Sequence, residues 1–138
     1  MTNKLNFEII TPEKIVYRDE IDSLTLPTQE GQITILPEHI PLVTMIVPGE
    51  IIIKKNNDFH HIAVMKGFLE TSQNHIKILT DAAELAEEID DRRAEEAKLR
   101  AKKAKAQATT NIEIAEATVA LERALTRIKV AQRKRKHH

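Results

Sequence analysis

Glycine and proline are confined to the first half of this chain, and this confinement limits what the chain can fold into. All three glycines and all five prolines lie before residue 68. Both residue types mark turns and interrupt helices. The first part should therefore consist of short segments between turns, and the second part can form long helices. We predict an α+β chain in two parts, comprising residues 1–86 and residues 87–138.

The charge of the chain divides at the same place. Residues 1–86 hold 7 Lys+Arg and 12 Asp+Glu, a net charge of −5, whereas residues 87–138 hold 14 and 9, a net charge of +5. Cysteine is absent, which excludes disulfides and thiolate chemistry and makes a reducing compartment the simplest location. The most apolar window, residues 42–53, is shorter than the roughly 20 apolar residues of a spanning helix, so any membrane association should come through a partner.

The first 80 residues have the pattern of short strands. Leu5, Phe7 and Ile9 alternate with polar residues, and similar runs recur between turn signals such as Pro48-Gly49. Residues 42–47 are too apolar to face water on either side of a sheet. Eight or more such strands predict a β-sandwich or flattened barrel, with β-branched residues filling the core because aromatic residues are scarce.

The second part has the pattern of two helices. Alanines at steps of three and four residues follow one helix face, and the pattern resumes after Thr109-Thr110-Asn111 with Ile114, Ala117, Leu121, Ala124, Ile128 and Ala131. Thr110 with Glu113 forms a capping box for the second helix. Asp81 with Glu84 fits a capping box, and Asp90 with the following residues fits another helix start. We place the first helix from about residue 89. The pattern predicts an antiparallel helical hairpin.

Folding the chain back near residue 110 places Arg93 near Arg127 and Arg100 within a turn of Arg123. Four guanidinium groups would then repel one another unless an anion lies between the helices. The alanine packing is weak as well, since a buried alanine methyl contributes less than a buried leucine. We therefore expect a conformational switch. The alternative is an ordinary solvated helical pair with its basic residues facing water.

Sequence motifs for catalysis are missing. The chain has no phosphate-binding glycine loop, no G-x-S-x-G and no H-E-x-x-H, so catalysis by this chain alone is not expected. His60 and His61 are consecutive and would point to opposite faces of a strand, which does not suit a shared metal. Seven basic residues and no acidic residue occur from Arg123 to Lys136. This run lacks aromatic residues, so an acidic protein surface is a better partner for it than nucleic acid, and a solvated helix end is the alternative.

Several short motifs occur in a fixed order along the chain. They are Leu26-Pro27, Gly31, Ile35-Leu36-Pro37 with His39 and Pro41, Pro48-Gly49-Glu50, Gly67-Phe68-Leu69-Glu70, and Ile89-Asp90-Asp91-Arg92-Arg93-Ala94, which is similar to an I-D-x-x-R-A element. With this ordered set the chain resembles the epsilon subunit of bacterial and chloroplast F-type ATP synthases over essentially its whole length. Thr34 and Glu38 stand where many members have glycine, which leaves the backbone of that loop open.

The resemblance implies a noncatalytic subunit that couples proton translocation to ATP synthesis. Its sandwich would bind the gamma subunit and the c ring, and its hairpin would inhibit ATP hydrolysis by extending into the alpha and beta subunits of the catalytic head. It would be peripheral on the cytoplasmic face of the cell membrane and bind no nucleic acid. No cofactor is required, but ATP is implied as a regulatory ligand. His39 and the basic residues Arg133, Lys134, Arg135 and Lys136 are the expected partner contacts.

The same resemblance assigns the ATP ligands residue by residue. They are Ile89, Asp90, Arg93 and Ala94 from the motif, Arg100, Arg123 and Arg127 for the phosphates, and Glu84 at the edge. Guanidinium groups suit phosphate oxygens because they donate paired, charge-assisted hydrogen bonds. Two other functions stay open: a nucleic-acid-binding β-barrel with a basic helical arm, and a free-standing nucleotide sensor.

Overall fold

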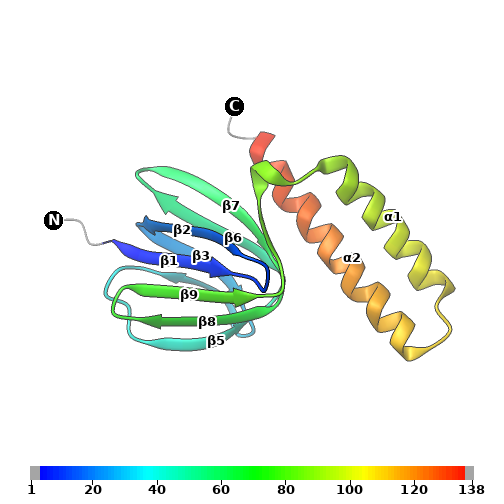
Figure 1. The fold of residues 1–138 in the computed structure, drawn as a ribbon, viewed down its shortest axis with the longest axis horizontal. Coiled ribbons are helices and arrows are strands. Elements are labelled where there is room, and N and C mark those ends of the chain that lie inside the picture. Colours follow the sequence, from blue (N-terminus) through cyan, green and yellow to red (C-terminus); the bar gives the residue numbers. More distant parts are fainter. Residues whose placement is uncertain (1–3, 136–138) are drawn as a thin grey trace. The chain divides into compact units, whose positions relative to one another are not determined.

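The computed structural model describes residues 4–135 and divides into two compact units, Met1–Leu85 and Ala86–His138 (Figure 1). The sequence places this boundary one residue later, after residue 86. Each unit has its own secondary structure and its own buried residues. The two units are therefore described separately.

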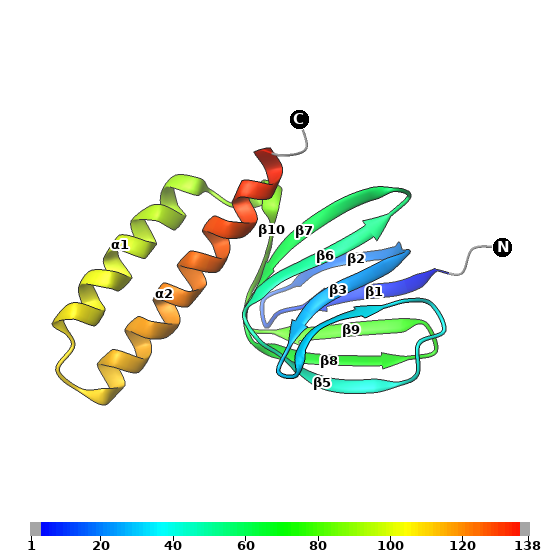
Figure 2. The same ribbon diagram turned by 180° about the vertical axis from the view of Figure 1, so that it is seen from behind.

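The first unit is a single, strongly curved sheet (Figures 1 and 2). Within residues 4–135 it has ten strands: β1 (Leu5–Ile10), β2 (Ile15–Ile21), β3 (Ser23–Thr28), β4 (Gly31–Ile35), β5 (Leu42–Ile46), β6 (Gly49–Lys55), β7 (Asp58–Val64), β8 (Gly67–Ser72), β9 (His75–Thr80) and β10 (Ala83–Leu85). The order is β10-β7-β6-β3-β5-β8-β9-β1-β2, and β4 pairs with β3. Strands β1 and β9 run parallel, whereas the other recorded pairs among the described residues are antiparallel. The predicted flattened barrel is confirmed.

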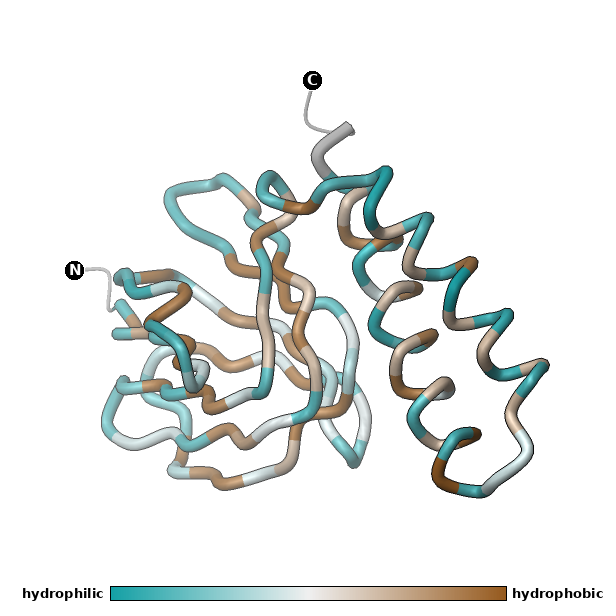
Figure 3. Tube along the Cα trace, turned by 45° about the vertical axis from the view of Figure 1, so that its right-hand side comes forward, coloured by the Kyte–Doolittle hydropathy of each residue, from teal (hydrophilic) through white to brown (hydrophobic). Residues whose placement is uncertain are grey.

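The core of this unit consists mainly of isoleucine, as the scarcity of aromatic residues predicts. Its fully buried side chains include Ile9, Ile35, Ile53 and Ile78, and Phe7 is the aromatic residue among them. Hydrophobic and hydrophilic residues alternate along much of the sheet (Figure 3). Branched side chains fit this arrangement because they pack well on a pleated surface.

The prediction for residues 42–47 is wrong. Side chains alternate along β5, so Ile46 is buried while Val43 and Met45 are exposed. The apolar run therefore does not mark a strand covered on both faces. It marks a strand with one apolar face in the core and a second apolar face on the surface.

Three positions show where this sheet does or does not require glycine. A Cβ added at Gly67 would lie 2.2 Å from the carbonyl oxygen of Leu79 on β9, so only glycine allows β8 to approach β9 this closely. Glu38 has a φ of 69°, the left-handed region that glycine prefers, and its N–H donates to Oδ1 of Asn74 at 2.6 Å. Thr34 lies in β4, where its hydroxyl is 3.0 Å from that of Thr25. Of the two positions that depart from the glycine pattern, Glu38 has the glycine-like backbone.

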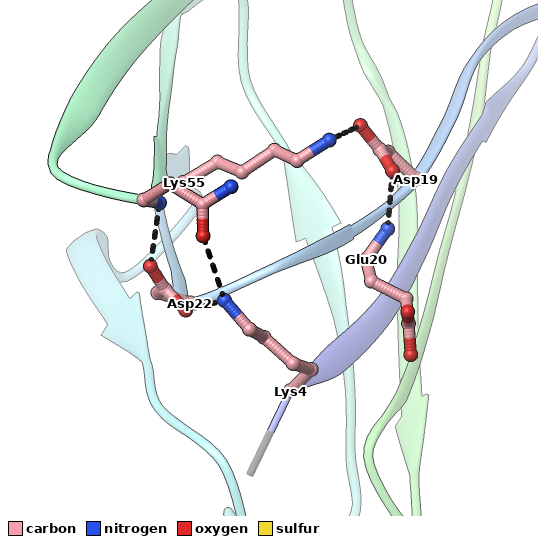
Figure 4. A network of polar contacts seen from close by, with 6 residues as sticks. Lys4, Asp19, Glu20, Asp22 and Lys55 are labelled. Carbon is pink, nitrogen blue, oxygen red and sulfur yellow. Dashed lines mark hydrogen bonds and ion pairs between the residues drawn. The ribbon is translucent and has the colours of Figure 1, made fainter. Parts of the chain in front are cut away.

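A polar network connects strands of the sheet at one end (Figure 4). Lys4 pairs with Asp22, and Lys55 pairs with Asp19 across 36 residues of sequence. The ammonium group of Lys55 lowers the pKa of Asp19 below its usual value, and that of Lys4 does the same for Asp22. These ion pairs lie where β2 passes into β3, so they stabilise a corner of the barrel.

The second unit contains two antiparallel helices among the described residues, α1 (Asp91–Gln107) and α2 (Asn111–Ala131) (Figures 1 and 2). One-turn 3₁₀ helices precede and follow them, at Ala86–Glu88 and Gln132–Arg135. The capping box of Thr110 and Glu113 is confirmed, and hydrogen bonds from Thr109 and Thr110 lower the pKa of Glu113. The predicted hairpin is therefore confirmed.

The start of the first helix differs from the prediction. Helix α1 begins at Asp91, two residues after the start predicted near residue 89, and its N-cap is Asp90, which confirms the second of the two start signals. The alternative start at Asp81 is wrong, because Thr80 ends a strand and residues 83–85 form β10, which the sequence pattern missed. Short strands carry little periodicity, and β10 is defined by its pairing with β7.

Candidate functional site

An apolar row crosses the outer face of the sheet. Met45 on β5 lies opposite Phe68 on β8, Phe68 lies opposite Leu79 on β9, and Leu79 lies opposite Ile10 on β1. Met45, Phe68 and Leu79 are 43%, 54% and 48% exposed. We call these four residues the apolar row. A contiguous apolar surface of this kind is typical of a protein interaction site.

The apolar row borders a groove of about 530 Å³ that residues 10–12 and Lys66, Gly67, Thr80 and Asp81 also line. Thr80 holds this region together, since its hydroxyl lies 2.9 Å from the carbonyl oxygen of Lys66 and 3.3 Å from that of Ala82. Sequence reasoning missed this surface. The signal was present in residues 42–47 and 67–69, where apolar residues occupy both faces of a strand.

A turn between β4 and β5 carries His39, one of the predicted partner contacts. Leu36 and Ile40 are exposed and His39 is half-buried, and the His39 backbone N–H donates to the carbonyl oxygen of Leu36 at 3.2 Å. The ring Nδ1 of His39 lies 2.6 Å from the carbonyl oxygen of Ile40. The turn therefore presents two apolar side chains and one imidazole at the surface.

The I-D-x-x-R-A element forms the start of helix α1. Oδ1 of Asp90 accepts a hydrogen bond from the Arg93 backbone N–H at 3.1 Å. Ile89 and Ala94 are buried and occupy the two positions, immediately before the cap and four residues into the helix, that form a hydrophobic staple. Three of the four motif residues thus have a structural role, and the side chain of Arg93 is 81% exposed.

The remaining predicted arginines lie on the helical hairpin. The N-terminal half of α1, with Arg93, lies beside the C-terminal half of α2, with Arg123 and Arg127 (Figure 2), and Arg100 lies just past the middle of α1. Arg100 and Arg123 are exposed and Arg127 is half-buried. The topology brings these segments together, and the side chains of Arg93, Arg100 and Arg123 are exposed.

A cavity of about 80 Å³ lies between the ends of the two helices. It is lined by Asp91, Glu95, Ile128, Ala131 and Gln132, none of which belongs to the predicted ligand set. Ligand pockets usually measure at least about 300 Å³. This cavity is too small for a nucleotide, so a nucleotide held by the arginines would lie on the surface of the hairpin in this conformation.

The other predicted site residues lie elsewhere. Glu84 belongs to the first unit, where it pairs with Ala63 of β7. Arg133 is half-buried in the last 3₁₀ helix, which also includes Lys134 and Arg135. The described residues end at Arg135, so Lys136 lies outside them.

Nδ1 of His61 lies 3.0 Å from Oε2 of Glu50, and both side chains are largely buried.

Two family descriptions match the chain, one for each unit. "ATP synthase, Delta/Epsilon chain, beta-sandwich domain" matches residues 4–86, and "ATP synthase, Delta/Epsilon chain, long alpha-helix domain" matches residues 87–132. This chain belongs to the ATP synthase delta/epsilon family. The resemblance stated from the sequence motifs is thereby confirmed.

Curated members of this family match nearly the full chain. An ATP synthase epsilon chain of Herpetosiphon aurantiacus is 40% identical over 131 residues, which cover 95% of this chain and 96% of the relative. An ATP synthase epsilon chain of Dehalococcoides mccartyi is 41% identical over 135 residues, which cover 97% of this chain and 96% of the relative. The whole chain therefore corresponds to an epsilon chain, a noncatalytic subunit of the complex.

Solved structures share the fold of this chain at lower identity. A chain of the Euglena gracilis mitochondrial ATP synthase, solved as OSCP/F1/c-ring, has a TM-score of 0.78 at 20% identity and covers 94% of this chain and 81% of that one. A chain from the central stalk and c-ring of the Tetrahymena thermophila mitochondrial ATP synthase has a TM-score of 0.66 at 15% identity and covers 94% of this chain and 98% of that one. In residues 4–135, no helix is long and apolar enough to cross a membrane.

Proposed function

We propose that this chain is a regulatory subunit in the central stalk of an F-type ATP synthase. Its sheet unit binds the gamma subunit and the c ring and thereby couples proton translocation to ATP synthesis. Its hairpin restrains ATP hydrolysis by contacting the alpha and beta subunits, and ATP binds the hairpin as a regulatory ligand. The complex holds the chain at the cytoplasmic face of the cell membrane.

The apolar row is the observation that carries the stalk assignment. Three of its side chains are about half exposed, and they lie in register on neighbouring strands of a sheet whose opposite face is a packed core. Such a surface suits the centre of a protein interface, because aromatic and methionine side chains are enriched there. We assign the gamma subunit to this row and the c ring to the exposed turn with Leu36, His39 and Ile40.

A charge placed in the row tests this assignment. We expect Phe68→Glu to abolish co-purification of the chain with the gamma subunit, since a carboxylate would lose its hydration in the interface. The matched control is Phe59→Glu on β7, because Phe59 is 48% exposed and lies outside the row. Unchanged gamma binding by the Phe68 variant, or equal loss in both variants, would exclude the row as the docking surface.

The proposed inhibitory role is supported by the division into two units, each of which matches its own family description. A chain ending at Ala86 should still bind the gamma subunit, while ATP hydrolysis by the reconstituted complex should rise. If the shortened chain restrains hydrolysis as well as the full chain does, inhibition belongs to the sheet unit.

The ATP-binding role is supported by the exposed guanidinium groups on neighbouring helix segments. Millimolar ATP should raise the melting temperature of the isolated full chain, and ADP should raise it less because ADP offers fewer phosphate oxygens. Arg123→Ala should weaken the ATP effect. Arg92→Ala is the control, because Arg92 pairs with Glu96 and lies outside the predicted ligand set. A melting curve that ATP leaves unchanged would remove the ligand from this function.

A further inference from the structure

Methionine supplies all the sulfur atoms of this chain. The sequence has no cysteine and three methionines, Met1, Met45 and Met65. Peroxides oxidise methionine thioethers to sulfoxides, and this reaction turns an apolar side chain into a polar one. A peroxide can therefore change the polarity of the surface of this chain at its methionines without changing its net charge.

The two methionines within residues 4–135 differ in their surroundings. Met45 on β5 is 43% exposed and lines the groove beside the apolar row. Met65 follows β7, is half-buried and does not line that groove. Its backbone N–H donates to the carbonyl oxygen of Ala82 at 3.0 Å, which holds this segment in the sheet unit. A peroxide should therefore reach Sγ of Met45 more readily than that of Met65.

We propose that Met45 is an oxidation site through which a hydroperoxide weakens docking of the sheet unit. The oxidation acts on the free chain, before a partner covers the apolar row. This inference rests on the proposed binding of the gamma subunit to that row, and it adds a chemical control of assembly to the binding.

The reaction at Met45 needs only the peroxide as its oxidant. A lone pair of Sγ forms a bond to one oxygen of hydrogen peroxide, and the O–O bond breaks. The proton on the transferred oxygen passes to the departing hydroxide, which leaves as water. The sulfur atom loses two electrons and the peroxide gains two. Sulfoxide reductases can reverse the product, so the change is not permanent.

The position of Met45 in the apolar row gives the oxidation its effect. Met45 lies opposite Phe68, and Phe68 lies opposite Leu79, so the sulfur belongs to a surface of otherwise hydrocarbon side chains. In the free chain the S=O group would be hydrated. In an interface centred on the row it would lose that hydration without a polar group of the row to replace it. Burial of an unpaired polar group should weaken binding by about 10- to 100-fold.

Two matched variants test the proposal, because each removes one methionine and keeps the other. The full-length wild type, Met45→Leu and Met65→Leu are treated with dilute hydrogen peroxide, which catalase then removes. Peptide mass spectrometry measures the sulfoxide at each methionine, and calorimetry measures the Kd for the purified gamma subunit before and after treatment. Each protein is compared with itself, since Met45→Leu alters the row before any oxidation.

Treatment should oxidise Met45 faster than Met65. It should raise the Kd of the wild type and of Met65→Leu by about 10- to 100-fold and leave that of Met45→Leu at its own starting value. Sulfoxide reductase with a thiol should restore binding by the wild type. A chain already bound to the gamma subunit should resist oxidation at Met45. The melting temperature of the oxidised chain should stay near that of the untreated chain, because the new polar group faces water.

Other results would overturn the inference. Oxidation of Met45 no faster than that of Met65 would contradict the argument from exposure. Complete oxidation of Met45 with an unchanged Kd would show that the interface tolerates the sulfoxide. An equal rise in Kd for Met45→Leu, or a large fall in melting temperature, would show damage elsewhere. In each case binding of the gamma subunit by the untreated chain stands, whereas an untreated wild type that does not bind it overturns the proposed docking and the inference together.

Discussion

Replacing Ala117 by leucine should open the helical hairpin, because Ala117 lies in a seam of small residues. Ala101 and Ala117 each lie eight residues from Thr109 in the connecting turn, and both are buried. Ala94 and Ala124, which are equally far from that turn, are buried as well. Alanine at these positions lets the helices approach closely, and a leucine side chain would need space that the seam does not have.

The size of the effect follows from the cost of overpacking. Extra methylene groups in a packed site cost about 1–3 kcal/mol, and 2 kcal/mol corresponds to about a 30-fold change in an equilibrium constant. If open and closed hairpins are equally populated in the wild type, the closed fraction falls from about one half to about 3%. A nucleotide that binds only the closed form would then bind about 15-fold more weakly.

The control for this change is Ala120→Leu, since Ala120 lies on the same helix and is exposed. Spectroscopic probes on cysteines introduced at Arg92 and Lys129, both exposed, would report the separation of the helix ends in this cysteine-free chain. The Ala117 variant should show a longer distance and weaker ATP binding, and the Ala120 variant should match the wild type. Equal behaviour of the two variants would refute the alanine seam as the element that limits closure.

Three further predictions concern the sheet unit. Gly67→Ala should lower the free energy of unfolding by several kcal/mol and lower the melting temperature strongly, because the new Cβ would lie 2.2 Å from the carbonyl oxygen of Leu79. A cooperative transition at the wild-type temperature would contradict this. Glu38→Gly should stabilise the chain by about 0.5–1 kcal/mol in urea unfolding, since relief of a left-handed backbone at φ 69° outweighs the added entropy of the unfolded chain. The hydrogen bond from Lys55 lowers the pKa of Asp19, so the contribution of this carboxylate to stability is present at neutral pH and is lost as the pH falls below about 4. Asp19→Asn should flatten that part of the acid unfolding curve. An unchanged curve would contradict the ion pair.

The sequence predicted the architecture well because strong periodic signals specify it. The confinement of glycine and proline to the first half predicted the division into sheet and hairpin. The capping box of Thr110 and Glu113 predicted the start of α2. The start of α1 and the strand β10 were less predictable. Asp81 and Asp90 both look like N-caps in the sequence, and only the pairing of residues 83–85 with β7 decides between them.

The site was less predictable than the fold. Apolar residues on both faces of β5 were interpreted as a doubly buried strand, because a sequence pattern cannot distinguish a second core from a surface kept for a partner. Helical spacing brought the arginine-bearing segments together, but it could not show that Asp90 and Ala94 serve the helix start. Those roles depend on the capping geometry, which sequence spacing alone does not specify.

The two units differ in the free energy needed to open them, and this difference suits a regulated subunit. Large branched side chains fill the sheet unit, and residues far apart in sequence pair along its strands, so opening it would expose the whole core. The hairpin is closed mainly by alanine methyl groups, each worth about 0.8 kcal/mol. Binding of one ligand at a hundredfold excess over its Kd supplies about 2.7 kcal/mol, which is enough to shift the hairpin but not to unfold the sheet. In the proposed function, a nucleotide would therefore change the state of the hairpin while the apolar row of the sheet stays in place for its partner.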